Sequence, residues 1–187
     1  LGYSRMLADR LIPDLSSGHV LVQGCRILLC DSDILRGMGA IGRALGVPVG
    51  FDTDVNGAGL AETRWGAAKG QRVAVYITVG TGVGGGVIVD GRPLTGLSHA
   101  EMGHMRVPRH ADDLGFDGIC PFHSDCLEGL VSGPAIMKRW GTSLSHLPVD
   151  HPAHNIVAWY LGQLVTTLQS IMEPGRIILG GGVMGTP

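Results

Sequence analysis

Basic clusters, aromatic residues and long apolar runs are all scarce in this chain of 187 residues. Only 16% of the residues are charged, the formal net charge is −2, and lysine occurs only at Lys69 and Lys138. A protein that binds the phosphate backbone of nucleic acid usually concentrates basic residues on one face, so a nucleic-acid partner is not expected. Every apolar run is shorter than the roughly 18–20 residues that cross a bilayer, so a membrane partner is not expected either.

The core must be mainly aliphatic, because aromatic residues make up only 5% of a chain that is 44% hydrophobic. The 31 glycines have no three-residue period, which excludes collagen, and the aliphatic runs between them exclude low-complexity disorder. The length suits one globular domain or two small lobes. Residues 1–18 carry charges where a signal peptide needs an apolar run, so we expect a cytoplasmic protein.

The clearest secondary-structure signal is the β-branched, apolar run 73–79, which predicts a buried strand. A glycine-rich segment, 80–86, follows it and is interpreted as a turn, after which residues 87–89 return as a second strand. Residues 176–179 predict a further strand. Short strand and helix signals complete the pattern: a strand over 47–51 and helices over 34–45, 57–68, 127–140 and 155–172, the last capped by Asn155 and burying Ile171.

The glycine-rich segment suggests phosphate binding. Its Gly80-x-Gly82-x-x-Gly85 spacing matches the dinucleotide fingerprint, but a strand follows where that fingerprint needs a helix. Neither lysine is placed for a Walker A loop. What remains is a hairpin whose backbone amides, with the hydroxyls of Thr78 and Thr81, face an anion. The alternative is a tight turn made for packing, and five glycines in seven residues favour phosphate.

Cys120, His123 and Cys126 present two thiolates and an imidazole within seven residues. A structural zinc site takes four such ligands, and His104 or His110 could supply the fourth. The alternative is two reduced cysteines and exposed histidines in a loop. The spacing favours zinc.

Asp54 follows the expected strand 47–51 and precedes a helix, a place where carboxylates often face a ligand crevice. It could take a proton from a sugar hydroxyl during phosphoryl transfer. The alternative is that Asp52, Asp54 or Asn56 only caps the helix, and spacing does not decide between the two. Three more polar residues suit sugar hydroxyls, which donate and accept hydrogen bonds at once: Glu101, His104 and Glu128.

Four ordered segments carry a family resemblance: VPVGFDTDVNGAGLAE (47–62), YITVGTGVGGGVIVDGRPLTGLSHAEMGH (76–104), GICPFHSDCLEGLVSGPA (118–135) and IILGGGVM (177–184). With them, the chain from about residue 35 to 184 resembles the ROK family of sugar kinases and sugar-responsive repressors, above all its bacterial fructokinase branch. The resemblance implies an α/β, actin-like and ribonuclease-H-like fold, in which ATP and sugar meet between two lobes.

Within that fold, residues 34–70 are expected to be a remnant of the N-terminal lobe and residues 71–187 the C-terminal lobe with its zinc loop. Residues 1–33 match nothing in the family and stay unassigned. The family's Asp-x-Gly-Gly-Thr phosphate loop and its C-terminal helices are expected to be missing from this chain. A full-length protein is expected to be a homodimer.

The resemblance also implies a role for each candidate residue. Asp54 falls where the family has its catalytic base, and sugar-contacting positions are Asn56, Glu101, His104 and Glu128. The phosphate motif falls on Thr78, Gly80, Thr81 and Gly82, and the adenosine loop on Gly180, Gly181 and Gly182. The zinc ligands carry over as His104, Cys120, His123 and Cys126. The implied cofactors are ATP, Mg²⁺ and Zn²⁺.

The predicted reaction is the ATP-dependent phosphorylation of a hexose, fructose to fructose 6-phosphate in first place. His123 between the cysteines and Thr53 before Asp54 are both similar to the fructokinase branch. The alternatives are a glucokinase or N-acetylmannosamine kinase of the same family, or a non-catalytic, repressor-like module that binds sugar. Repressors of the family carry an N-terminal helix-turn-helix, and residues 1–33, with Pro13 and no basic face, offer none.

Overall fold

The computed structural model describes residue 46 and residues 52–96 and 99–185. The helix expected over 34–45, the strand expected over 47–51 and the unassigned residues 1–33 lie outside these described residues.

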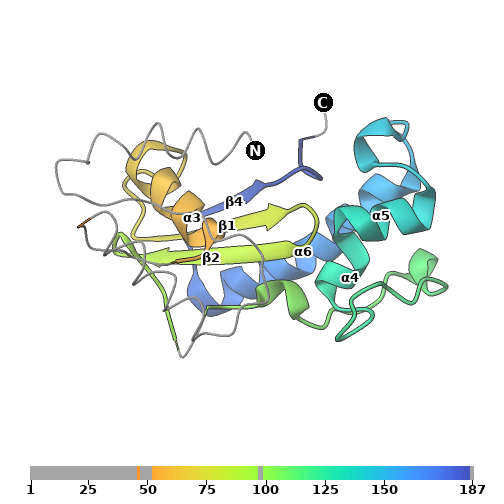
Figure 1. Ribbon diagram of the computed structural model, residues 1–187, viewed down its shortest axis with the longest axis horizontal. Coiled ribbons are helices and arrows are strands. Elements are labelled where there is room, and N and C mark those ends of the chain that lie inside the picture. The colour runs from red at the N-terminus through yellow and green to blue at the C-terminus, as the bar shows by residue number, and fades with distance from the viewer. Residues whose placement is uncertain (1–45, 47–51, 97–98, 186–187) are drawn as a thin grey trace.

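A four-stranded sheet of order β3-β2-β1-β4 is the centre of the structure (Figure 1). Its strands are β1 (Val73–Val79), β2 (Val83–Val89), β3 (Arg92–Pro93) and β4 (Arg176–Gly180). β1 and β2 form the expected antiparallel hairpin, with Val79 opposite Val83. β4 is parallel to β1, with Gly180 beside Thr78, so the turn after β1 and the loop after β4 leave the sheet at the same end. The predicted α/β class is confirmed.

Helices cover both faces of the sheet. Alternate residues of β1 and β2 face α3 (Asp54–Trp65), where a Cβ on Gly59 would lie 3.0 Å from Cγ1 of Ile88. The other residues of these strands join a core with α4 (Leu127–Val131) and α6 (Pro152–Met172). Figure 1 shows α6 running beneath the sheet, with α4 and α5 beyond the end at which β1 turns into β2. Burial on both faces explains the uninterrupted apolar run of β1.

The glycine-rich segment divides differently from the expectation. Only residues 80–82 form the turn, whereas Gly84, Gly85 and Gly86 belong to β2. A Cβ on Gly86 would lie 2.6 Å from Oδ1 of Asn56, and a Cβ on Gly85 would overlap the side chain of Met102. These three glycines therefore serve close packing, and the expectation that the whole segment is a phosphate-facing turn was wrong for them.

The helix expected over 127–140 is broken at Ser132 into α4 and α5 (Gly133–Trp140). Pro134 lies in the first turn of α5, where its missing N–H costs nothing. The N–H of Gly133 donates instead to the carbonyl of Gly80, at 2.7 Å. The helix is therefore interrupted at the point where the chain makes a tertiary contact with the β1–β2 turn.

Two further helix boundaries differ. α3 begins at Asp54 and ends at Trp65, rather than spanning 57–68. α6 begins at Pro152, where the ring of His151 accepts the N–H of Ala153, so Asn155 is not its cap. None of the helices in the described part of the chain combines the length and apolar character needed to cross a membrane.

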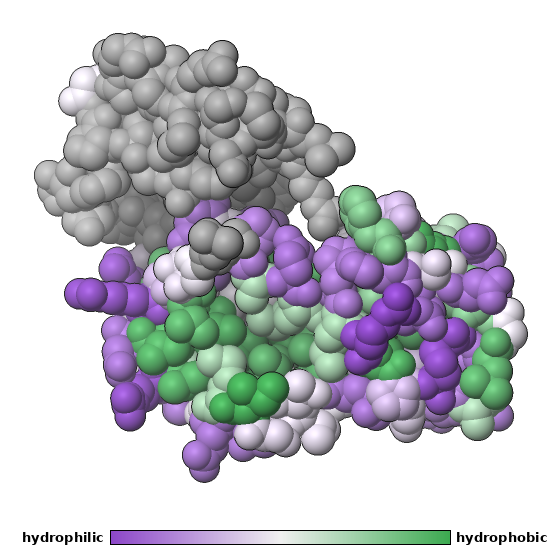
Figure 2. Space-filling view, turned by 90° about the horizontal axis from the view of Figure 1, so that it is seen from below, coloured by the Kyte–Doolittle hydropathy of each residue, from purple (hydrophilic) through white to green (hydrophobic). Residues whose placement is uncertain are grey.

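The C-terminal end of α6 is less buried than expected. Leu161, Leu164 and Leu168 pack into the core, but the Ile171 residue is 76% exposed. Figure 2 shows that apolar residues gather over one part of the face seen from below, with polar residues over another part. Helical spacing places Ile171 on the apolar stripe of α6, so the stripe alone does not determine burial at this end of the helix.

A buried polar network joins the stretch after His104 to α5 and α6. The hydroxyl of Tyr160, on α6, donates to Oδ2 of Asp113 at 2.8 Å and accepts the backbone N–H of His110 at 3.1 Å. Arg139, on α5, lies 3.3 Å from the same Asp113 oxygen. Tyr160 is fully buried and burial raises its pKa, so the phenol stays neutral and keeps donating.

Tyr160→Phe is expected to lower the free energy of unfolding by about 1–3 kcal/mol, because it leaves a buried carboxylate and a backbone N–H without this partner. Urea unfolding at pH 7 measures the difference. The folded pKa lies above the ordinary value of 10, so the phenol contributes fully below that pH and its contribution falls as the pH rises above it. The difference in the free energy of unfolding between wild type and variant should therefore become smaller in alkaline buffer. Equal stability at pH 7 would contradict this account.

Candidate active site and metal centre

The turn between β1 and β2 consists of Gly80, Thr81 and Gly82. It is closed by a hydrogen bond from the N–H of Gly80 to the carbonyl of Gly82, at 2.9 Å. Thr81 is exposed at its tip, whereas Gly82 is buried. Thr78 lies in β1 on the α3 side, where its methyl group is 3.6 Å from a Cβ built on Gly84. The turn thus presents one exposed threonine and a backbone without side chains, as an anion site requires.

The loop after β4 lies directly against the end of β1. Gly181 has a φ of +96°, and a Cβ there would lie 2.6 Å from the backbone nitrogen of Val79, so only glycine fits. The N–H of Val183 donates to the carbonyl of Val79, at 3.0 Å. Gly180 is the partner of Thr78 in the parallel ladder, and Gly182 is exposed beyond it. The two sets of glycines expected to bind the nucleotide therefore share one end of the sheet.

Asp54 is the first residue of α3, but Thr53 is the cap. The hydroxyl of Thr53 accepts the N–H of Asn56 at 3.2 Å. The carboxylate of Asp54 is exposed, and among the described residues it accepts only the adjacent N–H of Val55, at 2.9 Å. Asp52 accepts a hydrogen bond from the amide of Asn56, at 2.6 Å, and Asn56 is 4% exposed. The capping alternative thus falls to Thr53, which leaves Asp54 open to a substrate.

Glu101 precedes the short helix η2 (Met102–His104), and His104 is its last residue. Gly103 is buried because it packs on the backbone of Val83, where a side chain would overlap the carbonyl. Glu101 is exposed, with one oxygen 2.8 Å from Nε2 of His99. The packing of Gly103 therefore fixes η2 against β2 and carries His104 with it.

Glu128 lies in the first turn of α4, two residues after Cys126. Its Oε2 accepts the N–H of Val83 at 2.8 Å. Val83 is the residue that follows the β1–β2 turn, so this side chain ties α4 to the segment expected to bind phosphate. The carboxylate can accept from this N–H and still offer its other oxygen to a ligand.

The segments that carry these candidate residues all contact the first half of β2 (residues 83–86). α3 packs on it through Val55 and Asn56, η2 through Met102 and Gly103, and α4 through Glu128. The structure therefore holds the segments that carry Asp54, Asn56, His104 and Glu128 against the same four residues, although they are up to 74 positions apart in the sequence.

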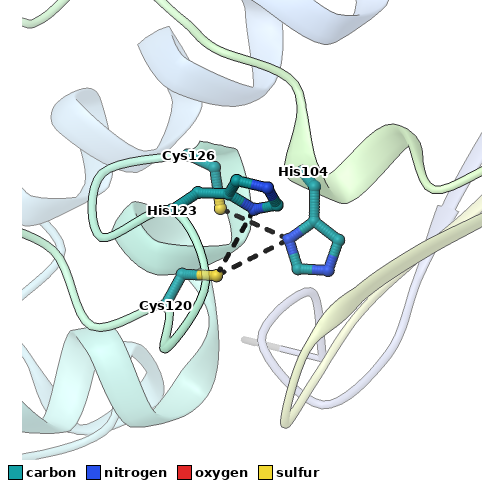
Figure 3. Close-up of side chains that lie close together, drawn as sticks. All are labelled: His104, Cys120, His123 and Cys126. Carbon is teal, nitrogen blue, oxygen red and sulfur yellow. Dashed lines mark hydrogen bonds between the residues drawn. The ribbon is translucent and has the colours of Figure 1, made fainter.

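The four residues expected to bind zinc point toward one another (Figure 3). The ligand atoms of His104, Cys120, His123 and Cys126 all lie within 4.8 Å of one another. Nδ1 of His104 is 3.5 Å from Sγ of Cys126 and 3.6 Å from Sγ of Cys120, which is 3.8 Å from Nδ1 of His123. A tetrahedral zinc ion holds sulfur at about 2.3 Å and nitrogen at about 2.0 Å, which separates them by about 3.5 Å. The donor set fits zinc.

The loop over residues 118–126, here called the metal loop, is shaped by its backbone. Cys120 and Ser124 exchange two hydrogen bonds, at 3.0 and 2.8 Å, and Ser124 adopts a φ of +53°. Cys126 then precedes α4, and the N–H of Leu127 donates to Met105, next to His104. His110 is not part of the cluster, because its Nδ1 accepts the N–H of Asp112 and its ring packs on Trp159.

Both cysteines of the metal loop are free and buried. In the absence of a cation, burial raises the pKa of Cys126 to about 11, so its thiol is protonated at neutral pH. A cation bound here displaces that proton and takes the thiolate. The cluster is therefore compatible with a bound metal.

Two site contacts were missed by sequence reasoning. In one, the N–H of Gly133 donates to the carbonyl of Gly80, and in the other, the carboxylate of Glu128 accepts the N–H of Val83. The first had a signal, since Gly133-Pro134 is typical of a helix start. The second is a contact between residues 45 positions apart, and no local pattern announces it.

Known proteins resemble this chain in both sequence and fold. Residues 38–187 match the model of the ROK family. A fructokinase of Zymomonas mobilis is 55% identical over 143 residues, which are 75% of this chain and 48% of that protein. A ROK hexokinase from Thermus thermophilus superposes with a TM-score of 0.66 at 32% identity, over 80% of this chain and 54% of that one.

A ROK family glucokinase from Streptomyces griseus, solved with glucose and AMPPNP, superposes with a TM-score of 0.57 at 25% identity, over 78% of this chain and 56% of that one. The expected actin-like fold is confirmed by these likenesses. The chain spans about half the length of the fructokinase it matches. Because the family model covers most of its residues, this chain belongs to the ROK family.

Proposed function

We propose that this protein phosphorylates a hexose with ATP, and that its preferred substrate is fructose, which becomes fructose 6-phosphate. The observation that carries the proposal is the packing of α3, η2 and α4 on residues 83–86, directly after the Gly80–Gly82 turn. It brings the segment of the general-base candidate and those of the sugar-binding candidates to the turn expected to hold phosphate. The 55% identity to a fructokinase supports the choice of sugar.

Asp54 would take the proton of the sugar hydroxyl as its oxygen attacks the γ-phosphorus of ATP. The new oxygen–phosphorus bond forms while the bond to the bridging oxygen breaks, and ADP leaves with that electron pair. Asp54 suits this role because it is exposed, and because the capping of α3 is done by Thr53. Mg²⁺, when bound to the nucleotide, neutralises phosphate charge.

The nucleotide would lie at the end of the sheet where β1 and β4 finish. Thr78, Gly80, Thr81 and Gly82 would face its phosphates with backbone N–H groups and hydroxyls. Gly180, Gly181 and Gly182 would face the adenosine. Support comes from the shared end of the two strands and from the absence of side chains at these glycines, which permits close approach of a ligand to the backbone.

The sugar would be held by Asn56, Glu101, His104 and Glu128. Carboxylates accept the hydrogen bonds of sugar hydroxyls, while amide and imidazole groups can also donate. His104 would serve two neighbours, because its Nδ1 faces the cysteines and leaves Nε2 for a ligand. Glu128 would connect the sugar to the Gly80–Gly82 turn, because its carboxylate accepts the N–H of Val83.

We also propose that His104, Cys120, His123 and Cys126 hold one Zn²⁺, which braces the sugar side of the site. The same proposal includes a cytoplasmic, homodimeric full-length protein. It assigns residues 34–70 to the N-terminal lobe and residues 71–187 to the C-terminal lobe, with residues 1–33 unassigned.

The chain purified without a histidine tag is expected to contain one zinc ion, measured by plasma mass spectrometry. Cys120→Ser combined with Cys126→Ser should abolish the metal, because a closed tetrahedral site cannot lose two of its four ligands. Cys25→Ser combined with Cys30→Ser is the matched control: it removes the other two cysteines of the sequence, which are not among the four proposed ligands, and should keep the zinc. Full zinc in the first double variant would refute the site.

Asp54→Asn is expected to reduce kcat by a factor of about 10²–10⁴, because the amide cannot take a proton. Thermal stability should be unchanged, since Thr53 still caps the helix. A coupled assay of ADP release measures the rate, with a relative's Asp-x-Gly-Gly-Thr loop fused to the chain because its sequence contains no such motif. Asp90→Asn, an exposed carboxylate far along the hairpin, is the control. Wild-type turnover in the Asp54 variant would exclude it as the base.

The same fusion should show its highest kcat/KM with fructose when fructose, glucose, mannose and N-acetylmannosamine are compared. The reason is that the four sugar-binding candidates offer a fixed set of donors and acceptors, and a site built around one set of hydroxyls rejects a sugar that leaves its polar groups unpaired. A preference for glucose would contradict fructose as the substrate but would still support the proposed phosphorylation of a hexose. Sugar binding by calorimetry without any turnover would instead support a repressor-like module.

A further inference from the structure

We infer that Arg109 is a positioning residue for the metal loop, which it connects to the buried end of α6. This inference rests on the proposed zinc site and adds a residue outside its ligands. The metal loop supplies three of the four ligands and His104 supplies the other, so the site forms only if the loop is held at a fixed place relative to η2. Arg109 lies in the stretch that joins the two.

The guanidinium of Arg109 contacts three separate parts of the chain. Nη1 lies 3.5 Å from Oδ2 of Asp125, in the metal loop. Nε lies 3.4 Å from the hydroxyl of Tyr160, on α6. Nη2 donates to two backbone carbonyls in its own stretch, those of Asp113, at 2.6 Å, and Phe116. The side chain is only 21% exposed, so water competes little for these contacts.

Asp125 is the place where this network reaches the metal. It stands between His123 and Cys126, so any shift of its backbone moves a ligand on each side. Its other partner is Arg106, which pairs with Oδ1. The side chain of Arg106 is 65% exposed, and exposed ion pairs contribute little because solvent screens them. Of the two arginines, Arg109 is therefore the one that can hold the loop.

The far end of the network is buried. Tyr160 is fully buried, and Asp113, which accepts a hydrogen bond from the hydroxyl of Tyr160, is 5% exposed. Arg139 packs over the ring of Phe116 at 4.0 Å and reaches the same carboxylate. Arg109 thus transmits the position of α5 and α6 to the metal loop, and its two carbonyl contacts curl the stretch between His104 and Cys120 into a fixed path.

Only arginine fits this role. One planar guanidinium carries donors in three directions, whereas the ammonium group of lysine is a single point at the end of a flexible stem. Lysine at this position keeps the charge but cannot reach Asp125, Tyr160 and the two carbonyls together. Arg109→Lys therefore tests geometry rather than charge, and Arg106→Lys is its matched control on the same carboxylate.

The experiment follows the release of Zn²⁺ from the purified, zinc-loaded chain to a chromophoric chelator. Arg109→Lys is expected to speed release about tenfold, the lower end of the effect of groups that orient metal ligands. Arg106→Lys should stay within about twofold of wild type. In the cobalt-substituted chain, the visible absorption of Co²⁺ should change in Arg109→Lys only, because the ligands are no longer held in the same geometry.

Tyr160→Phe separates positioning from general stability. It should lower the melting temperature at least as much as Arg109→Lys, yet change zinc release less, since the contact of Arg109 with Asp125 remains. Release at the wild-type rate in Arg109→Lys, or faster release in Tyr160→Phe than in Arg109→Lys, would overturn the inference while leaving the zinc site intact. A wild-type chain that holds no zinc would overturn both the site and the inference.

Discussion

The close approach of three chain segments to the first half of β2 is the constraint on which the rest of this structure depends. Gly84 and Gly86 admit α3 on one face, and Gly85 admits η2 on the other. Any side chain at Gly85 or Gly86 would meet an atom of the opposing segment, so the whole arrangement requires glycine there. Asp54 and His104 owe their placement to this packing, and Asn56 takes part in it directly.

The end of the sheet at which β1 and β4 finish is assembled in the same indirect way. The β1–β2 turn contains one internal hydrogen bond, and its position is fixed by neighbours: Gly133 donates to Gly80, and Glu128 accepts from Val83. The loop after β4 is attached to β1 through Val183. The turn is thereby held through the N–H groups of Gly80 and Val83, while no hydrogen bond within the described residues is seen for the N–H groups of Thr81 and Gly82. A turn held in this way by its neighbours keeps one backbone geometry.

The chain also places a concentrated group of charges inside an otherwise sparsely charged protein. Arg109, Arg139 and Asp113 share one buried network with Tyr160. Nε and Nη1 of Arg139 find no hydrogen-bond partner within the described residues, but its guanidinium lies 4.0 Å from the centre of the Phe116 ring and 4.6 Å from that of Trp140. Cation–π contacts of this kind offset part of the cost of burying the charge. Through Arg109, the same network also contacts Asp125 of the metal loop.

The sequence by itself determined the strand over 73–79 with its bounds, the hairpin, and three of the four residues of the metal cluster, because these signals are local. Seven apolar, mostly β-branched residues permit little but a buried strand, and Cys120, His123 and Cys126 share one short loop. Residue spacing left His104 and His110 as equal candidates for the fourth ligand, and the family resemblance favoured His104. In the structure, the packing of Gly103 on Val83 brings His104 to the cluster.

Tertiary structure alone decided the rest. Gly84, Gly85 and Gly86 belong to β2 because two segments from elsewhere must pack on that strand, and α4 ends at Val131 because the N–H of Gly133 bonds to a turn 53 positions away. Ile171 is exposed although it continues an apolar stripe, because an apolar position is buried only where another segment packs against it. In each case the outcome depends on which distant surface is within reach, and a pattern read along the chain contains no information about that distance.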